Sequence, residues 1–126
     1  MTRSPEHAAQ AAFIEWTAYR LGEYPELEWI FAIPNGGHRH KAVAGRMKAE
    51  GVKAGVPDLF LPVPRGGFHG LWMETKIKPN KPTEAQTSWL EFLEGQGYAV
   101  SVCFGVEELI DAAEWYLGLS AEVSDG

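Results

Sequence analysis

Two short motifs could bring two carboxylates and an amine together. Asp58 follows Pro57 at the start of one apolar segment, and Glu74 and Lys76 lie two residues apart in the next. Because strand side chains alternate between faces, Glu74 and Lys76 share a face that Asp58 can approach from the partner strand. Neighbouring carboxylates repel each other unless a cation such as Mg²⁺ lies between them. A lysine beside the ion could act on a water or a phosphate, so the trio suits hydrolysis of a phosphodiester.

Each motif also has a purely structural interpretation. A Glu-x-Lys sequence on a strand is usually a solvated pair of charges, and Pro-Asp commonly starts a turn. Placement on two adjacent strands, between loops rich in glycine and lysine, favours the functional interpretation.

Glu6 is a further candidate acid on the first predicted helix. At 100° per residue, Glu6 falls on the apolar side with Phe13, whereas Glu15 falls on the opposite face. An acid that points inward needs a partner, and a metal ion would serve. The alternative is that Glu6 only favours the positive end of the helix dipole. Gln86 presents a similar choice, because it completes the capping box that begins at Thr83 and lies on the buried side of its helix.

Charge is unevenly distributed along the chain. The net charge of −6 argues against nucleic acid at first. Nine basic and three acidic residues lie between Arg39 and Lys81, however, whereas the rest has two basic and fourteen acidic residues. A basic middle suits an anionic ligand on one face, and a randomly solvated surface is the alternative. The candidate phosphate contacts are Asn35, Gly37, Arg39 and Lys41 in a glycine loop at a helix start, extended by Lys48, Lys53 and Lys78.

The elements that must position these residues follow from periodicity and turn residues. We predict helices near 5–21, 41–50, 84–95 and 106–117, and strands near 27–33, 58–63, 71–77 and 98–104. The order αβαββαβα indicates an α/β fold, a mixed sheet flanked by helices, in one domain over residues 1–126 with a core at about 5–117 and a flexible tail at 118–126.

Two absences narrow the setting. No apolar run approaches the roughly 20 residues that span a bilayer, and the first residues are not a secretory leader. Cys103 is the only cysteine and sits in an apolar run, which predicts a buried, inert thiol. We therefore expect a reducing, cytoplasmic setting.

The motifs together resemble a known family of nucleases. The Val-Pro-Asp sequence ending at Asp58, followed by Glu74-Thr75-Lys76, resembles the PD-(D/E)XK nuclease superfamily. The fuller pattern resembles the VRR-NUC domain, the virus-type replication-repair nuclease, from about Glu6 to Leu117. It comprises Glu6 and Gln10 in a first helix, Pro34-Asn35-Gly36-Gly37 before Arg39, the stretch from Lys48 to Asp58, Glu-x-Lys, and Gln86.

This resemblance implies a restriction-endonuclease-like core and a Mg²⁺ or Mn²⁺ ion. The ion would be held by Asp58, Glu74, the backbone carbonyl of Thr75 and Glu6, directly or through water. Lys76 would act on the attacking water, with Gln86 in support.

The resemblance also implies a substrate. Stand-alone members in phages and bacteria look like homodimeric resolvases of four-way (Holliday) junctions, so we expect a structure-selective DNA endonuclease in DNA repair that recognises backbone shape and charge. The alternatives are a flap or nicking nuclease of the same fold and a non-catalytic DNA-binding module. The sequence does not exclude RNA.

Overall fold

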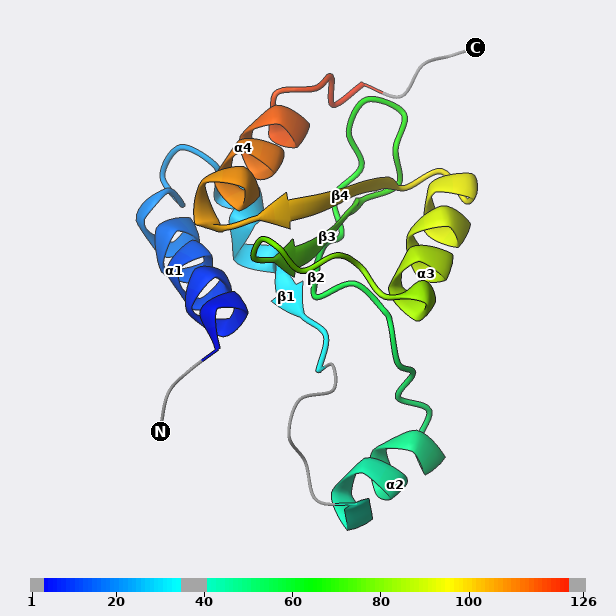
Figure 1. The fold of residues 1–126 in the computed structure, drawn as a ribbon. Helices are drawn as coiled ribbons and strands as arrows, with labels where there is room; N and C mark the ends of the chain where they lie inside the picture. The colour runs from blue at the N-terminus through cyan, green and yellow to red at the C-terminus, as the bar shows by residue number, and fades with distance from the viewer. Residues whose placement is uncertain (1–3, 35–40, 123–126) are drawn as a thin grey trace.

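One mixed sheet with helices on both sides forms the fold (Figure 1). The computed structural model describes residues 4–34 and 41–122. The predicted order of helices and strands is confirmed, with one additional short 3₁₀ helix. In chain order the elements are α1 (Pro5–Tyr19), the 3₁₀ helix η1 (Pro25–Trp29), β1 (Phe31–Ala32), α2 (Lys41–Ala49), β2 (Leu59–Leu61), β3 (Leu71–Lys76), α3 (Glu84–Gly95), β4 (Ala99–Phe104) and α4 (Val106–Leu117).

The strands follow one another across the sheet in the order β1-β2-β3-β4. The β1–β2 and β2–β3 pairs are antiparallel, and the β3–β4 pair is parallel. A parallel pair needs a crossover connection, which α3 provides. The register pairs Leu59 with Met73 and Phe60 with Trp72. Alternation along β3 therefore turns Met73 to one face of the sheet, and Trp72 and Glu74 to the other.

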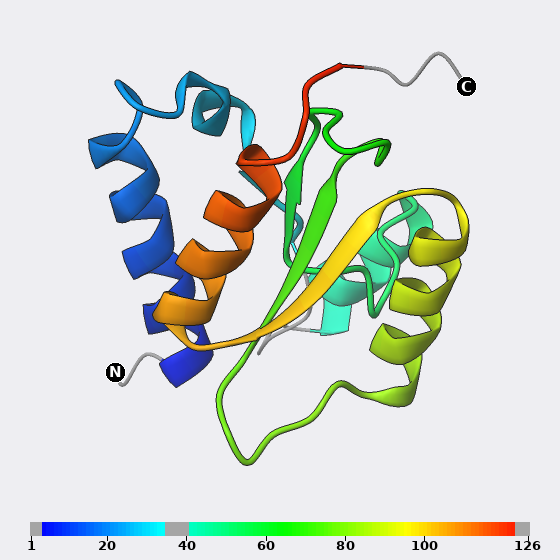
Figure 2. The same cartoon turned by 90° about the horizontal axis from the view of Figure 1, so that it is seen from above.

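The hydrophobic core lies on the face of the sheet that α1 and α4 cover (Figure 2). Its largest side chains are fully buried, and each contributes about 1.5–3 kcal/mol of transfer free energy. They are Phe13, Leu59, Leu61, Leu71, Met73, Leu109 and Tyr116. Cys103 is buried there as predicted, and burial raises the pKa of its thiol to about 11, which keeps it protonated and unreactive.

The other face of the sheet carries α3 and an aromatic cluster. Phe60 and Trp72 stack with their ring centroids 4.1 Å apart, and the Tyr98 ring meets Phe60 edge-on at 5.8 Å. Figure 2 shows α2 on the same side of the sheet as α3. Glu74 and Lys76 therefore extend a face whose other end is packed with aromatic rings.

The predicted strand at 27–33 is largely wrong. Residues Pro25–Trp29 form a 3₁₀ helix, and only Phe31–Ala32 pairs with β2. The backbone N–H of Leu27 donates to Tyr24 at 3.0 Å, and that of Ile30 donates to Leu27 at 3.4 Å. Pro25 fixes φ at the first turn, and a buried Leu27 followed three residues later by a half-buried Ile30 matches three residues per turn.

Other boundaries differ from the predicted ones by one or two residues. The helix predicted near 5–21 ends at Tyr19, and β2 is Leu59–Leu61 instead of 58–63. Prolines at positions 62 and 64 lack the N–H that would continue the ladder, which explains the shorter strand. None of the described helices combines the length and apolar character needed to cross a bilayer.

Gly66 and Gly67 form the turn between β2 and β3. Both have positive φ, at 57° and 86°, between the paired residues Arg65 and Phe68. Two consecutive positive φ values define the hairpin turn that fits the twist of the strands. Arg65 forms an ion pair with Glu26 at 2.5 Å. It is therefore engaged in holding the hairpin to η1 instead of adding to a basic surface.

Candidate active site

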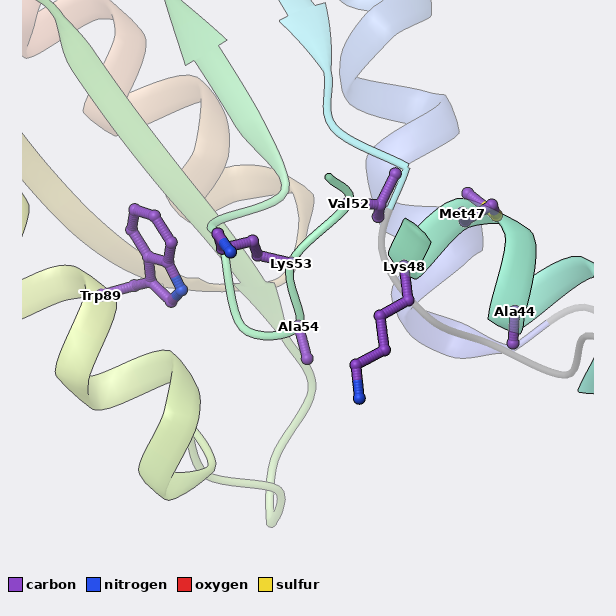
Figure 3. A pocket seen from close by; sticks show the side chains of 7 residues that line it. All are labelled: Ala44, Met47, Lys48, Val52, Lys53, Ala54 and Trp89. Atoms are coloured by element: carbon purple, nitrogen blue, oxygen red, sulfur yellow. The ribbon is translucent and has the colours of Figure 1, made fainter. Parts of the chain in front are cut away.

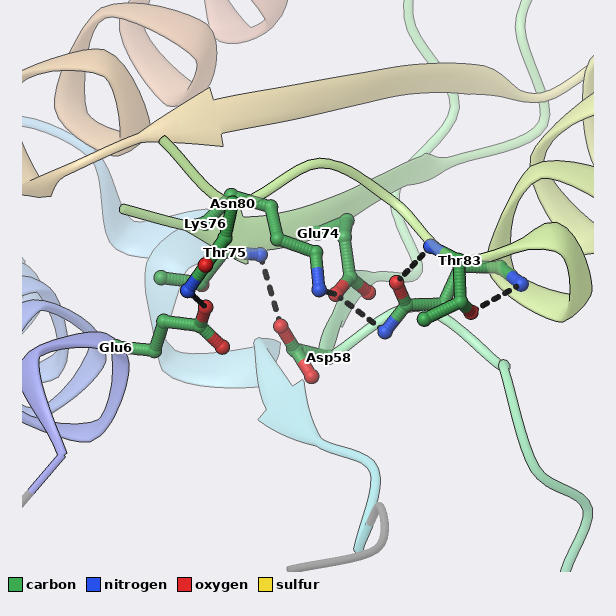
Figure 4. Close-up of polar contacts among 8 residues, drawn as sticks. Glu6, Asp58, Glu74, Thr75, Lys76, Asn80 and Thr83 are labelled. Carbon is green, nitrogen blue, oxygen red and sulfur yellow. Dashed lines mark hydrogen bonds and ion pairs between the residues drawn. The ribbon is translucent and has the colours of Figure 1, made fainter. Parts of the chain in front are cut away.

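Asp58 lies directly before β2, and its carboxylate contacts the backbone of the neighbouring strand β3. Its Oδ2 accepts a hydrogen bond from the backbone N–H of Thr75 at 2.8 Å (Figure 4). The backbone N–H of Ile33 donates to the carbonyl of Asp58, also at 2.8 Å. The N–H and C=O of a strand residue point to the same edge, so the Thr75 carbonyl faces the Asp58 edge of β3. The Lys76 carbonyl points to the opposite edge, where it accepts from the backbone N–H of Gly105 at 3.0 Å.

Glu74 is a carboxylate at the centre of the site with a relative exposure of 1%. Its Oε2 accepts from Nε2 of Gln86 at 3.0 Å and lies 3.5 Å from Nζ of Lys76. Its Oε1 is buried without a hydrogen-bond partner among the residues that the structure describes. Burying an unsatisfied carboxylate oxygen is costly, so this atom calls for a partner that the protein itself does not supply.

The pKa of Glu74 is raised from 4.5 to about 8. Burial is the largest cause, and the negative charge of Asp58 is the second. Lys76 opposes them and lowers the pKa, while Glu6 raises it slightly. The Glu74 carboxylate is therefore held where the field of the protein disfavours a negative charge.

Lys76 ends β3 with its ammonium group beside Glu74. The residue is only 6% exposed, and the two side chains lie on one face of the strand as predicted. Removing two charges from water costs free energy that their mutual attraction barely offsets, so a buried ion pair adds little to stability. The burial of Lys76 beside Glu74 therefore argues for a role in the site.

Glu6 and Glu15 differ as predicted for the two faces of α1. Glu15 is exposed, whereas Glu6 is half-buried near the start of the helix. Ser4 caps α1 by accepting from the backbone N–H of His7 at 3.1 Å. Asn80 donates from Nδ2 to Oε2 of Glu6 at 3.2 Å, which ties α1 to the loop after β3. Asn80 was not predicted as a site residue, because its contact with Glu6 joins residues far apart in the chain.

Gln86 forms the predicted helix cap and also contacts the buried carboxylate of Glu74. The capping box is confirmed: Oε1 of Gln86 accepts from the backbone N–H of Thr83 at 2.8 Å, and Oγ1 of Thr83 accepts from that of Gln86 at 3.2 Å. The other atom of the same amide, Nε2, donates to Glu74. The start of α3 thereby orients a buried carboxylate.

Gln86→Ala is expected to lower both stability and the phosphodiester hydrolysis predicted from the sequence. The variant loses half of the capping box, worth about 1 kcal/mol, and also the donor to Glu74. Thr83→Ala is the matched control, because it removes the other half of the box and leaves the bond to Glu74 in place. Denaturant unfolding should show similar losses of stability for both variants, while assays of the predicted phosphodiester hydrolysis should show a loss for Gln86→Ala alone. Equal activity of the two variants would reduce Gln86 to a helix cap.

The donor set fits a hard divalent cation. Asp58 and Glu74 provide neighbouring carboxylates, and one buried Glu74 oxygen has no partner within the described part of the chain. The Thr75 carbonyl faces the edge of β3 on which Asp58 lies. No three His, Cys, Asp or Glu side chains of residues 4–34 and 41–122 converge into a ready metal cluster. Mg²⁺ is commonly bound by one or two carboxylates and retains several waters, so two carboxylates and a carbonyl suffice.

The predicted DNA contacts are only partly described. Asn35, Gly37 and Arg39 lie outside the described residues. Lys41 is the first residue of α2, while Lys48 and Lys53 are exposed and line a groove beside α2. Lys78 is exposed just beyond β3, with Nζ 5.9 Å from the centre of the Phe104 ring. Whether any of them contacts nucleic acid stays a prediction.

Comparison with known proteins identifies the family. The VRR-NUC domain matches residues 4–107, most of the chain. The chain belongs to the VRR-NUC family. A solved structure named "VRR_NUC domain protein" is 28% identical, with a TM-score of 0.78 over 95% of this chain and 93% of that one. A search of curated proteins found no match. The mixed sheet with flanking helices is thus the VRR-NUC nuclease fold, and the chain is a nuclease domain.

Proposed function

We propose that this VRR-NUC protein is a metal-dependent, structure-selective DNA endonuclease whose preferred substrate is a four-way (Holliday) junction. The observation that carries the hydrolytic part is the convergence of Asp58, Glu74 and Lys76, with a buried Glu74 oxygen that lacks a partner among the described residues. A solvated surface pair would not be buried in this way, and a purely structural role would not require two adjacent carboxylates.

Asp58, Glu74, the Thr75 carbonyl and Glu6 would hold Mg²⁺ or Mn²⁺, directly or through water. When bound, such an ion polarises a phosphoryl oxygen and lowers the pKa of a water. Lys76 would hold the attacking water or the phosphate with its Nζ, and the buried position keeps that group beside Glu74. Gln86 would keep the Glu74 carboxylate in one orientation.

The substrate assignment rests on charge, shape and symmetry. Recognition of DNA by Lys48, Lys53 and Lys78 would read the backbone and not the bases. One small site cuts one strand, so paired cuts in a junction call for a two-fold dimer. The interface we propose for this dimer consists of exposed apolar side chains on α1 and α4: Ile14, Tyr19 and Trp115. We expect the protein to act on this DNA in the reducing cytoplasm.

The test is a cleavage assay on three labelled DNA substrates. Duplex, flap and four-way-junction DNA are incubated with the protein and Mg²⁺, Mn²⁺ or a chelator, beside the Asp58→Ala variant. We expect metal-dependent, symmetric paired cuts in the junction, and loss of cleavage by at least about 100-fold in the variant, as is typical when a group that stabilises the transition state is removed.

Other outcomes separate the alternatives. Cleavage of flaps or nicking of duplex without paired cuts would replace the junction with the simpler substrate. Absence of cleavage with every substrate and metal would leave a DNA-binding module. Sedimentation of the free protein tests the dimer independently, and a monomer at assay concentrations would contradict symmetric resolution by a stable pair.

A further inference from the structure

A groove of about 590 Å³ lies between α2, the segment before β2, and α3 (Figure 3). Its volume falls in the range of sites that hold a small ligand. α2 contributes one wall and Trp89 of α3 the opposite one, with Lys53 between them. The lining residues are Ala44, Met47, Lys48, Val52, Lys53, Ala54 and Trp89.

The groove combines an aromatic face with positive charge. Lys48 and Lys53 are exposed. Among the described residues that line the groove none is acidic, and those other than the two lysines and Trp89 are apolar. Trp89 is half-buried and meets Phe92 edge-on at 6.3 Å, and Phe92 is 57% exposed. Proteins that bind single-stranded nucleic acid use this combination, stacking bases on aromatic rings and tracking phosphates with cations.

Two of the segments that line the groove, α3 and the segment before β2, also position residues of the candidate active site. Trp89 lies three residues after Gln86, hence on the same face of α3, and Gln86 donates to Glu74. Between the two walls, the segment that carries Lys53 continues to Asp58. A Cβ added at Gly55 would lie 2.8 Å from the backbone carbon of Ala85, so this segment packs directly on the start of α3. A strand held in the groove would therefore run toward the carboxylates.

We propose that this groove binds unpaired nucleotides of the substrate strand next to the cleaved bond. One base would stack on Trp89, and Lys48 and Lys53 would contact the flanking phosphates. A base inside a duplex is already stacked on its neighbours and cannot enter such a groove without being unpaired. Branch points offer bases that are unpaired or easily unpaired, so the groove would select branched over continuous DNA. This inference rests on the proposed nuclease function and assigns it a substrate feature.

The test is a binding experiment that does not depend on cleavage. Affinities for a thymidine oligonucleotide, a blunt duplex of equal length and a four-way junction are measured in chelator with the intact protein. Trp89→Ala should weaken binding of the oligonucleotide by about 10- to 100-fold, the range for loss of one stacked base, and leave the blunt duplex unchanged. Trp89→Phe should restore most of the lost affinity, and Trp29→Ala, which changes an exposed tryptophan elsewhere, should have no effect.

The lysines provide a second readout. Lys48→Ala and Lys53→Ala should each reduce the slope of affinity against salt concentration by about one. Equal weakening for oligonucleotide and duplex by Trp89→Ala, with an unchanged melting temperature, would overturn the proposal. So would unchanged DNA binding with a shift from dimer to monomer, which would make the groove an interface between copies. All of these affinities are measured in chelator, where no substrate is cut. A loss of oligonucleotide binding in Trp89→Ala would therefore support the groove even if the proposed catalysis failed its own test.

Discussion

Glu74→Gln is expected to stabilise the metal-free protein at pH 8 and above while abolishing metal-dependent cleavage. Glutamine retains the shape of the side chain but carries no charge, so the variant mimics protonated Glu74. It removes the buried negative charge that burial and Asp58 disfavour, and with it the charge that would attract the metal ion. Stability and activity should therefore move in opposite directions.

The direction of the expected stability change follows from the titration of Glu74. The pKa of Glu74 is about 8 in the folded protein, against 4.5 for an unperturbed glutamate. Between these values the unfolded chain has released the proton and the folded protein still holds it, so wild-type stability falls as pH rises through this window. Glutamine does not titrate. The advantage of the variant should be absent below pH 4.5, grow through the window and level off above pH 8.

Thermal unfolding in chelator between pH 4 and pH 9 measures the effect. Each pKa unit corresponds to about 1.4 kcal/mol, so the full shift corresponds to a few kcal/mol and a gain in Tm on the order of 10 °C at high pH. Glu15→Gln is the matched control on an exposed glutamate and should show no such gain. Added Mg²⁺ should raise the Tm of the wild type and not that of Glu74→Gln. A Tm difference that is independent of pH would contradict the account of Glu74.

Lys76→Met is expected to lower the rate of cleavage by about 100- to 1000-fold while preserving metal binding. Methionine fills nearly the same buried volume without the ammonium group. Asp58→Asn should instead lose both metal binding and cleavage, because Asp58 is a proposed ligand. The pair of variants thus distinguishes a group that acts on the water or phosphate from one that holds the ion.

Calorimetric titration with Mn²⁺ and single-turnover cleavage test this pair. Lys78→Met serves as the comparison, because Lys78 is an exposed lysine two residues farther along. Its loss should weaken DNA binding and change the single-turnover rate at saturating protein very little. A Lys76→Met variant that still cleaves at the wild-type rate, or that no longer binds Mn²⁺, would show that Lys76 has a different role.

Features governed by local periodicity were predictable from the sequence. The alternation of strand side chains placed Glu74 and Lys76 on one face, and the helical repeat separated Glu6 from Glu15. The capping box at Thr83 depends on residues three apart, so it too could be identified. These predictions needed only the geometry of one strand or one helix.

Features that depend on packing between distant segments were not predictable in the same way. The Asn80–Glu6 bond joins residues separated by 74 positions, and the Gln86–Glu74 bond joins a crossover helix to the strand before it. The apolar pattern at 27–33 favoured a strand, but the turn that begins at Pro25 overrode it. The groove at Trp89 likewise exists only because α2 and α3 lie on the same side of the sheet.

The register between β2 and β3 makes the proposed chemistry inseparable from the core. Leu59 opposite Met73 fixes the hydrophobic packing, and the residues next in line are Asp58 and Glu74. A slip of one residue would send Glu74 into the apolar layer and Met73 out of it. Misaligned chains would thus lose hydrophobic burial and proposed metal ligands together, so inactive but compact forms are selected against during folding. In a refolding experiment, the fraction of cleavage activity that is recovered would measure the fraction of molecules with the correct register.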